Sequence, residues 1–342
     1  MTPFPAGLTR TWLPVCLSRE LKAKPLARKL AGVPLVLFRD ASGAAAALED
    51  RCPHRNYPLS DGKMVDGAIR CSYHGWRFDG GGACVEIPGA GDGACSDRPN
   101  ERLGAKRIEL VERYGAVFVR LEADPGAPDL VLPPLLGDPN HDHFWWSQPP
   151  WKARALDALE NILDPFHTNF VHDGLIRVSG KRQAVRQTVV QHADGVEVVY
   201  EQDEPDRGWM SRLLEGDRQR SVGRYYPPVV FQGRWEKKDR LTLCATAFFV
   251  PETQDRFRGF GCWTTPKGRA PAWLKRQAIM AFVRPVAAQD RRALERQHAT
   301  IAAFGGPRFK SGPTDRVTAP LTRLYQGETL EPSVDGPNTI WL

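Results

Sequence analysis

Short apolar stretches separated by turn residues dominate the first third of the chain. Residues 33–39 (VPLVLFR) are rich in strand-forming residues, and a turn separates them from a candidate return strand at 44–48. Residues 107–122 (RIELVERYGAVFVRLE) contain two further strand patterns, which the Tyr114-Gly115 pair interrupts. Strands of this length with frequent turns predict a small β-domain over residues 1–125.

The rest of the chain mixes two periodicities. Helical patterns cover residues 155–174 and 272–304, and Pro285 is expected to break the second helix or to begin a new one. Strand patterns lie between them, with a hairpin turn at Asp194-Gly195, whereas the C-terminal 30 residues show no regular pattern. After a Pro-rich boundary, residues 126–342 are therefore predicted to form an α+β domain. The expected strands cover 182–194, 195–204, 224–236, 240–250 and 256–264.

Composition narrows the classes of function. The 342 residues suit two domains of ordinary size, and 42% hydrophobic and 25% charged residues are typical of a soluble globular protein. The sequence contains no run of about 18 apolar residues, so it predicts no transmembrane helix. The N-terminus does not resemble a secretory signal. The net charge of +7 is scattered and accompanies no nucleic-acid motif. It indicates either a plain Arg-rich surface or attraction of an acidic redox partner or an anionic substrate.

Two short motifs within residues 52–76 have the spacing of metal ligands. Cys52 and His54 are separated by one residue. After sixteen further residues come Cys71 and His74, which are separated by two residues. Two Cys and two His suit a Rieske [2Fe–2S] cluster, in which the Cys hold one iron and the His hold the other. They also suit a structural zinc site. Zinc fingers usually pair Cys with Cys and His with His, whereas each motif here carries one of each, which favours the cluster.

The other cysteines and histidines form no comparable motif. The 7 cysteines lack the paired spacing of a disulfide framework, which indicates a reducing cytoplasm. Cys84 and Cys95 follow the cluster motifs but are expected to be ordinary thiols. His141 and His143 are spaced H-x-H, without a third ligand nearby in the sequence.

The cluster motifs, together with Pro53 and the Gly75-Trp76 pair, resemble the Rieske loops of ring-hydroxylating and demethylating oxygenases. Rieske proteins of cytochrome bc complexes carry an extra cysteine in each loop, and residues 55–57 and 72–73 contain none. The resemblance covers about residues 10 to 300. It implies an α+β fold in which a Rieske β-domain precedes a catalytic domain with an antiparallel sheet curled around long helices.

A second motif of this family occurs at residues 160–172 (ENILDPFHTNFVH). Its D-x-x-H-x-x-x-x-H spacing resembles the site that holds mononuclear Fe(II) through two His and one carboxylate, and it makes His167 and His172 the predicted ligands. A step of three residues stays on one helix face, but a step of five does not. The helix is therefore expected to loosen between Thr168 and His172.

The third iron ligand that the resemblance implies is Asp290, in the helical stretch 284–297. The alternative is a solvated helix residue paired with a neighbouring arginine, and Glu295 and Asp173 are the other carboxylates considered.

Two further residues of the motif are expected to take part in catalysis. The resemblance implies that Asp164 lies between a Rieske histidine and an iron histidine, usually across a subunit boundary. There a carboxylate would fix both rings and provide a short hydrogen-bonded path for electrons. Asn161 matches a family position near the iron.

The resemblance implies the oxygenase component of a Rieske oxygenase, which activates O2 with electrons that pass through the cluster. The chain has no dinucleotide motif and no ferredoxin-type cysteine run. NAD(P)H is therefore expected to act only through a separate reductase, with or without a ferredoxin. Length and motifs resemble the single-subunit vanillate, dicamba and methylxanthine demethylase group. This favours monooxygenation, by hydroxylation or oxidative O- or N-demethylation, of a small aromatic or alicyclic substrate in a cytoplasmic homotrimer.

Several alternatives stay open. Cis-dihydroxylation is the second reaction, desaturation or cyclisation is a third, and a Rieske electron carrier without catalysis is a different class of protein. Five aromatic residues are candidates equally for pocket walls and for the core: Trp209, Tyr225, Tyr226, Phe231 and Trp235.

Overall fold

The computed structural model describes residues 4–90, 101–123, 130–176, 183–202 and 219–342. The chain divides into two compact units, Thr9–Val131 and Met1–Leu8 together with Leu132–Leu342. None of the helices in the described ranges is long and apolar enough to cross a membrane. Cys95 and Trp209 lie outside the described residues.

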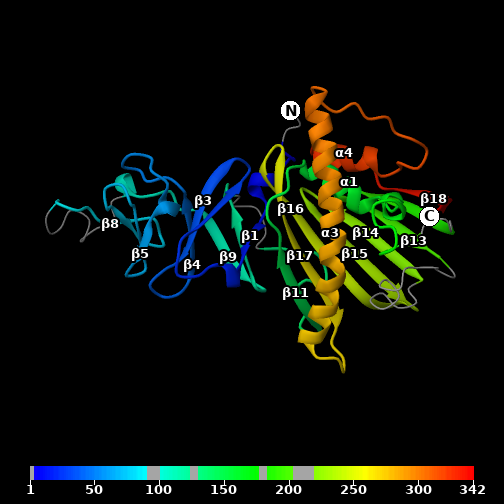
Figure 1. Ribbon diagram of the computed structural model, residues 1–342, viewed down its shortest axis with the longest axis horizontal. Coiled ribbons are helices and arrows are strands. Elements are labelled where there is room, and N and C mark those ends of the chain that lie inside the picture. The colour runs from blue at the N-terminus through cyan, green and yellow to red at the C-terminus, as the bar shows by residue number, and fades with distance from the viewer. Residues whose placement is uncertain (1–3, 91–100, 124–129, 177–182, 203–218) are drawn as a thin grey trace. The chain divides into compact units, whose positions relative to one another are not determined.

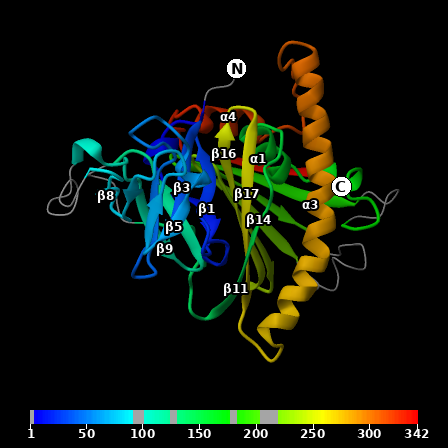
Figure 2. The ribbon, with the colours of Figure 1, turned by 60° about the vertical axis from the view of Figure 1, so that its left-hand side comes forward.

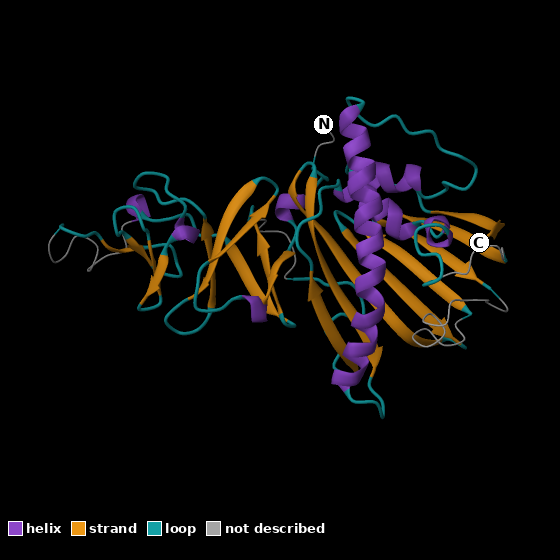
Figure 3. Cartoon of the chain, viewed as in Figure 1, coloured by secondary structure: helices purple, strands orange, loops and turns teal. Residues whose placement is uncertain are grey.

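Three small antiparallel sheets make up the unit Thr9–Val131 (Figure 3). Their strand orders are β1-β10-β9, β2-β3-β4 and β5-β6-β7-β8. The two strands predicted within 107–122 are β9 and β10, and the Tyr114-Gly115 pair joins them with positive φ angles of 55° and 85°. The β fold predicted for this part of the chain is confirmed. Its strands are β1 (Leu13–Leu17), β2 (Leu26–Leu30), β3 (Val33–Arg39), β4 (Ala45–Glu49), β5 (Lys63–Val65), β6 (Ala68–Arg70), β7 (Arg77–Phe78), β8 (Cys84–Glu86), β9 (Glu109–Arg113) and β10 (Ala116–Arg120).

One apolar core of this unit lies beneath the cluster motifs. Strands β3 and β4 contribute Phe38 and Leu48, and the third sheet contributes Phe78. Cys52 and Cys71 belong to the same core, with only 2% and 3% of their surface exposed. Because protein cores are closely packed, the two thiols are held in fixed positions.

An eight-stranded antiparallel sheet dominates the second unit (Figure 1). Its order is β11-β17-β16-β15-β14-β13-β12-β18, so β12 to β17 lie side by side in chain order while β11 and β18 form the two edges. The predicted hairpin is confirmed: Ala193 and Asp194 form the turn between β12 and β13, and Gly195 is the first residue of β13. The strands are β11 (His141–Ser147), β12 (Ala184–His192), β13 (Gly195–Glu201), β14 (Arg220–Tyr226), β15 (Val230–Lys237), β16 (Arg240–Thr253), β17 (Arg256–Pro266) and β18 (Ser333–Trp341).

Helices cover one face of this sheet. The long helix α3 (Ala272–Ala303) runs along the sheet in both views (Figures 1 and 2), and its side chains Phe282 and Val283 pack with Phe144 of β11 and Leu243 of β16. The shorter helix α1 (Ala155–Leu163) lies against β14, β15 and β16. Helix α4 (Thr318–Tyr325) contacts α1 and β13.

Helix α1 ends earlier than the sequence predicted. The expected helix covers 155–174 and loosens after Thr168, but the structure ends it at Leu163. Asp164 is already extended, with φ −85° and ψ 123°. The reason is Pro165, because a proline disfavours the helical conformation of the residue before it.

Three other expectations about secondary structure were wrong. Pro285 neither breaks nor begins a helix; its ring is exposed, and packing of the neighbouring apolar residues on the sheet keeps α3 continuous. The stretch 224–236 belongs to two strands, because the Pro227-Pro228 pair cannot donate to a sheet and forms the turn between β14 and β15. The C-terminal residues contain α4 and β18; β18 is an edge strand in which Ile340 is buried and its neighbours are exposed, so it lacks an apolar pattern.

Candidate functional site

The two cluster motifs form loops with the same backbone hydrogen bonds. The N–H four residues after each cysteine donates to the carbonyl of that cysteine, at 2.8 Å for Cys52 and 3.1 Å for Cys71. The N–H of each cysteine donates to the carbonyl five residues later, at 2.8 Å and 2.9 Å. Asn56 and Gly75 occupy the same place in these loops, with φ of 58° and 78°. Two nearly equal loops therefore present the C-x-H and C-x-x-H motifs.

The four side chains of the loops separate into two pairs. Burial raises the pKa of the Cys52 thiol to about 11, and a hydrogen bond with the Cys71 thiol adds to this rise. His54 is half-buried and His74 is exposed, and their ring centroids are 4.6 Å apart. Trp76 stacks on His54 with an interplanar angle of 6°. The thiols thus lie on the core side and the imidazoles on the solvent side.

This arrangement of donors fits a Rieske [2Fe–2S] cluster, which needs two thiolates at one iron and two imidazoles at the other. Desolvation lowers the pKa of His54, and the nearby His74 and Arg55 lower it further. A lowered pKa favours the neutral imidazole, which is the form that binds a metal.

The second candidate site begins where α1 ends. The carboxylate of Asp164 accepts the N–H of Phe166 at 2.9 Å and that of His167 at 3.3 Å, and these bonds start a 3-10 turn, η5 (Phe166–Asn169). His172 begins the next turn, since its carbonyl accepts the N–H groups of the third and fourth residues after it. These two turns replace the expected helix and bring both imidazoles to one place.

His167, His172 and Asp290 converge at this place. The Nε2 atoms of His172 and His167 lie 3.1 Å and 3.6 Å from Oδ1 of Asp290. One ligand atom from each of the three residues lies within 4.8 Å of the others. Two ligand atoms at a right angle, each about 2.1 Å from a metal ion, lie about 3 Å apart. The group therefore fits one metal ion with two His and one carboxylate on one side and open positions on the other.

Asp290 comes from the sheet-facing stripe of α3. Phe282, Val283, Val286 and Leu294 line the same cavity at helical spacing, and Asp290 is the acidic member of this stripe. The competing expectation paired Asp290 with a neighbouring arginine. In the structure Arg291 pairs with Glu295 at 3.0 Å, while Asp290 faces the histidines.

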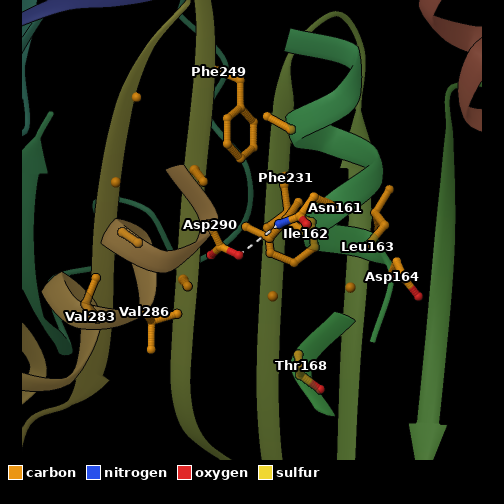
Figure 4. A pocket seen from close by; sticks show the side chains of 18 of the residues that line it. Asn161, Ile162, Leu163, Asp164, Thr168, Phe231, Phe249, Val283, Val286 and Asp290 are labelled. Carbon is orange, nitrogen blue, oxygen red and sulfur yellow. Dashed lines mark hydrogen bonds between the residues drawn. The ribbon is translucent and has the colours of Figure 1, made fainter. Parts of the chain in front are cut away.

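Two amide side chains form hydrogen bonds with members of this group. Oε1 of Gln289 lies 2.9 Å from Nδ1 of His172, and because an amide oxygen only accepts, Nδ1 carries the proton and Nε2 is left for a metal. Nδ2 of Asn161 donates to Oδ1 of Asp290 at 3.2 Å (Figure 4). Burial lowers the pKa of His172, but the hydrogen bond and charge of Asp290, with the bond to Gln289, raise it above its usual value.

Asp164 lies beside His167 without a hydrogen bond to its ring. Its Oδ2 is 3.7 Å from Nδ1 of His167, which is longer than a hydrogen bond. That Nδ1 is buried and has no hydrogen-bond partner among the described residues. The Asp164 side chain is 35% exposed, so it is accessible to a further polar group.

A cavity of about 310 Å³ lies next to the three residues. Its walls come from α1, α3 and the sheet, and several of them are aromatic: Trp146, Phe231, Trp235, Phe249, Trp263 and Phe282 (Figure 4 shows part of this wall). Of the candidates from the sequence, Phe231 and Trp235 line the cavity. Tyr225 belongs to the core, where its hydroxyl donates to the carbonyl of Pro228 at 2.8 Å. Tyr226 lies under Arg224, outside the cavity lining.

Small residues of the sheet form another part of this cavity, which the sequence analysis did not identify. Gly223 pairs with Gly233 across β14 and β15, and Gly261 lies opposite Ala247 across β16 and β17. A Cβ placed on Gly261 meets no atom within 4 Å, so its space belongs to the cavity. Glycine inside a strand often marks a close approach of another group, and this was the available signal.

The remaining candidates have structural roles. Nδ1 of His141 lies 3.1 Å from Asp138, and His143 bonds the Thr264 hydroxyl at 3.1 Å. Cys84 is fully buried in the core beneath the cluster motifs.

Comparisons with known proteins match both parts of the chain to protein families. Residues 11–101 match the family model of the Rieske [2Fe-2S] domain, and residues 151–320 match that of the vanillate O-demethylase oxygenase C-terminal domain. The dicamba O-demethylase oxygenase component of Stenotrophomonas maltophilia is 43% identical over 52% of this chain and 52% of its own length. The 3-chlorobenzoate-3,4-dioxygenase oxygenase subunit of Comamonas testosteroni is 33% identical over 51% of this chain and 40% of its own length. The chain thus spans about half the length of these curated relatives or less.

The fold is also that of a solved relative. The crystal structure of dicamba monooxygenase bound to dicamba superposes with a TM-score of 0.76, over 93% of this chain and 96% of the other, at 24% sequence identity. A Rieske domain with paired Cys-His loops is followed in this chain by a catalytic domain of the vanillate O-demethylase type. The chain therefore belongs to the Rieske non-haem iron oxygenases, among their oxygenase components.

Proposed function

We propose that the protein is a terminal monooxygenase. It uses O2 and electrons from a separate reductase to hydroxylate, or oxidatively O- or N-demethylate, a small aromatic or alicyclic substrate. Its cofactors are a Rieske [2Fe–2S] cluster on Cys52, His54, Cys71 and His74, and a mononuclear Fe(II). The observation that carries this proposal is the convergence of one carboxylate and two imidazoles beside a cavity with aromatic walls.

The residues of the chain take separate parts in this function. An iron ion, when bound, would supply open coordination positions for O2. His167, His172 and Asp290 would hold it, and Gln289 and Asn161 fix the orientation of His172 and Asp290. The aromatic and glycine-lined cavity takes a flat, largely apolar molecule and keeps bulk water away from the reacting atoms.

The active unit is proposed to be a cytoplasmic homotrimer. The partly exposed carboxylate of Asp164 and the unbonded Nδ1 of His167 support this, because together they would join the ring of a neighbouring subunit's cluster histidine to the iron site. Light scattering of a sample while it is active should give the mass of three chains. An active monomer would rule the trimer out.

Single-turnover chemistry tests the proposed reaction. The purified protein is reduced chemically and exposed to O2 with a panel of methylated and unmethylated aromatic and alicyclic compounds. The masses of the products are then measured by mass spectrometry. Formaldehyde release establishes demethylation, and gain of one oxygen without formaldehyde establishes hydroxylation. Gain of two oxygens would instead establish dihydroxylation, the second candidate, which the similarity to a dioxygenase subunit favours. Reoxidation of the cluster without any product would refute the proposed substrate class.

Gly261 offers a test of the cavity as the substrate site. We expect Gly261→Val to fold as well as the wild type, or to gain roughly 0.5–1 kcal/mol, because its Cβ enters open space and glycine weakens a strand. The substituted side chain reduces the cavity, so turnover of the larger accepted substrates should fall at least about tenfold. The exposed strand residue Gly336, changed to Val, serves as the control and should leave the substrate range unchanged. An unchanged substrate range in Gly261→Val would place the substrate elsewhere.

A further inference from the structure

A second cavity, of about 190 Å³, lies beside the first. Both are lined by Asn161, Asp164, Pro165, Tyr200 and Leu294, so one layer of side chains separates them. Whereas the first cavity has mostly apolar walls, the second lies along the polar face of α1. On that face Asp157, Glu160, Asn161 and Asp164 follow one another at steps of three, one and three residues.

The second cavity has the properties of a site for water. Gln187, on β12, is 1% exposed and lines it. Its Nε2 lies 3.4 Å from the hydroxyl of Tyr200, but its Oε1 is buried and has no hydrogen-bond partner in the described part of the chain. A buried acceptor of this kind is normally satisfied by ordered water, and a polar cavity of this size holds several molecules.

Glu160 is the carboxyl group of this cavity that is best placed to carry a proton. It is half-buried, and the hydroxyl of Thr318 donates to its Oε1 at 2.5 Å. Burial raises the pKa of Glu160, and the facing carboxylates of Asp157, Asp315 and Asp164 raise it further, while the bond from Thr318 lowers it in part. The net pKa lies above that of an ordinary glutamate. The other buried carboxylate, Asp157, is paired with Arg154 at 2.8 Å.

We propose that the second cavity delivers protons to the first, with Glu160 as the proton donor to its water. This inference rests on the proposed function, in which R–H, O2, two electrons and two protons give R–OH and one water. The reductase supplies the electrons and O2 is the oxidant. For each proton, the O–H bond of Glu160 breaks and the proton passes through cavity water toward the first cavity at Asn161 and Asp164. The carboxylate of Glu160 then takes a proton from solvent water.

The test compares Glu160→Gln with the wild type in the full, cluster-containing protein. Glutamine keeps the size and an acceptor for Thr318 but has no acidic proton. We expect product formation in a single turnover to slow by about 10²-fold, with a larger solvent deuterium isotope effect, while chemical reduction of the cluster keeps its wild-type rate. Glu160→Asp should recover part of the rate. Glu328→Gln, an exposed glutamate paired with Arg323, is the matched control and should behave as wild type.

The pH profile separates proton delivery from a structural role. The rate of product formation by the wild type should fall as pH rises through the pKa of Glu160. This fall in rate, the alkaline limb of the pH profile, should be absent in Glu160→Gln. In Thr318→Val, loss of a bond that lowers the pKa should move the limb to higher pH. Infrared spectroscopy gives a test that does not depend on turnover. The wild type should show a C=O band of protonated Glu160 that is absent from Glu160→Gln. As pH rises, this band should disappear at a higher pH than the bands of exposed carboxyl groups.

The outcomes are distinguishable. A wild-type protein that never consumes O2 refutes the proposed function and this inference with it. A wild type that turns over, with a Glu160→Gln variant that matches it in rate, pH profile and isotope effect, refutes this inference alone.

Discussion

Replacing His167 with alanine is expected to abolish product formation and leave the red-brown cluster in place. The imidazole is one of three predicted ligands that converge within 4.8 Å, and without it only His172 and Asp290 remain to hold the iron. The cluster motifs belong to the other compact unit of the chain, so their ligands are untouched. The variant should keep the visible absorption of a Rieske cluster and accept an electron, but form no product in a single turnover.

This variant also separates two classes of protein. A Rieske electron carrier would keep all its activity in His167→Ala, because electron transfer by the cluster does not involve that residue. His192→Ala is the control, since His192 ends β12 and lies outside the first cavity. Wild-type product formation in His167→Ala would show that the iron site was assigned wrongly.

Replacing Cys71 with serine is expected to prevent binding of the cluster. Without the cluster, electrons from the reductase should support no product formation. A hydroxyl is a far weaker iron ligand than a thiolate, and Cys71 is 3% exposed within the core beneath the loops. Metal binding contributes free energy of folding to a site of this kind, so the variant should also melt at a lower temperature. Visible absorption, electron paramagnetic resonance of the reduced protein and thermal melting measure these effects.

Cys84 provides the matched control for this experiment. It is fully buried in the same core but lies outside the two loops. Cys84→Ala should lose some stability, as truncated core residues do, and keep the cluster spectrum. A cluster that survives in Cys71→Ser and disappears in Cys84→Ala would reverse the assignment of these cysteines.

Most of the candidate site residues could be predicted from the sequence because they lie in short local motifs. The C-x-H and C-x-x-H spacing places each thiol and imidazole within a single loop, whose backbone hydrogen bonds are local. Asp290 required a long-range contact between α3 and the end of α1, and its prediction rested on resemblance. A physical signal was nevertheless present, because Asp290 interrupts an apolar stripe that includes Val286 and Leu294.

Other features depend on tertiary packing, and the local pattern of apolar and polar residues does not predict them. Pro285 signals a helix break, yet packing of Phe282 and Val283 on the sheet outweighs that preference. Strand β18 has exposed polar residues along most of its length because it forms an edge of the sheet. The cavity depends on which strand glycines face the helices, and pairing such as Gly223 with Gly233 follows only from the register of neighbouring strands.

Iron content is the most direct test of the claim that one chain carries both a Rieske cluster and a mononuclear iron. We expect about three irons for each wild-type chain, two in the cluster and one in the second site. We expect about two irons in His167→Ala, with the Rieske spectrum retained, and about one in Cys71→Ser, with that spectrum lost. A colourless wild-type protein that contains zinc, or a His167→Ala variant with as much iron as the wild type, would contradict this claim.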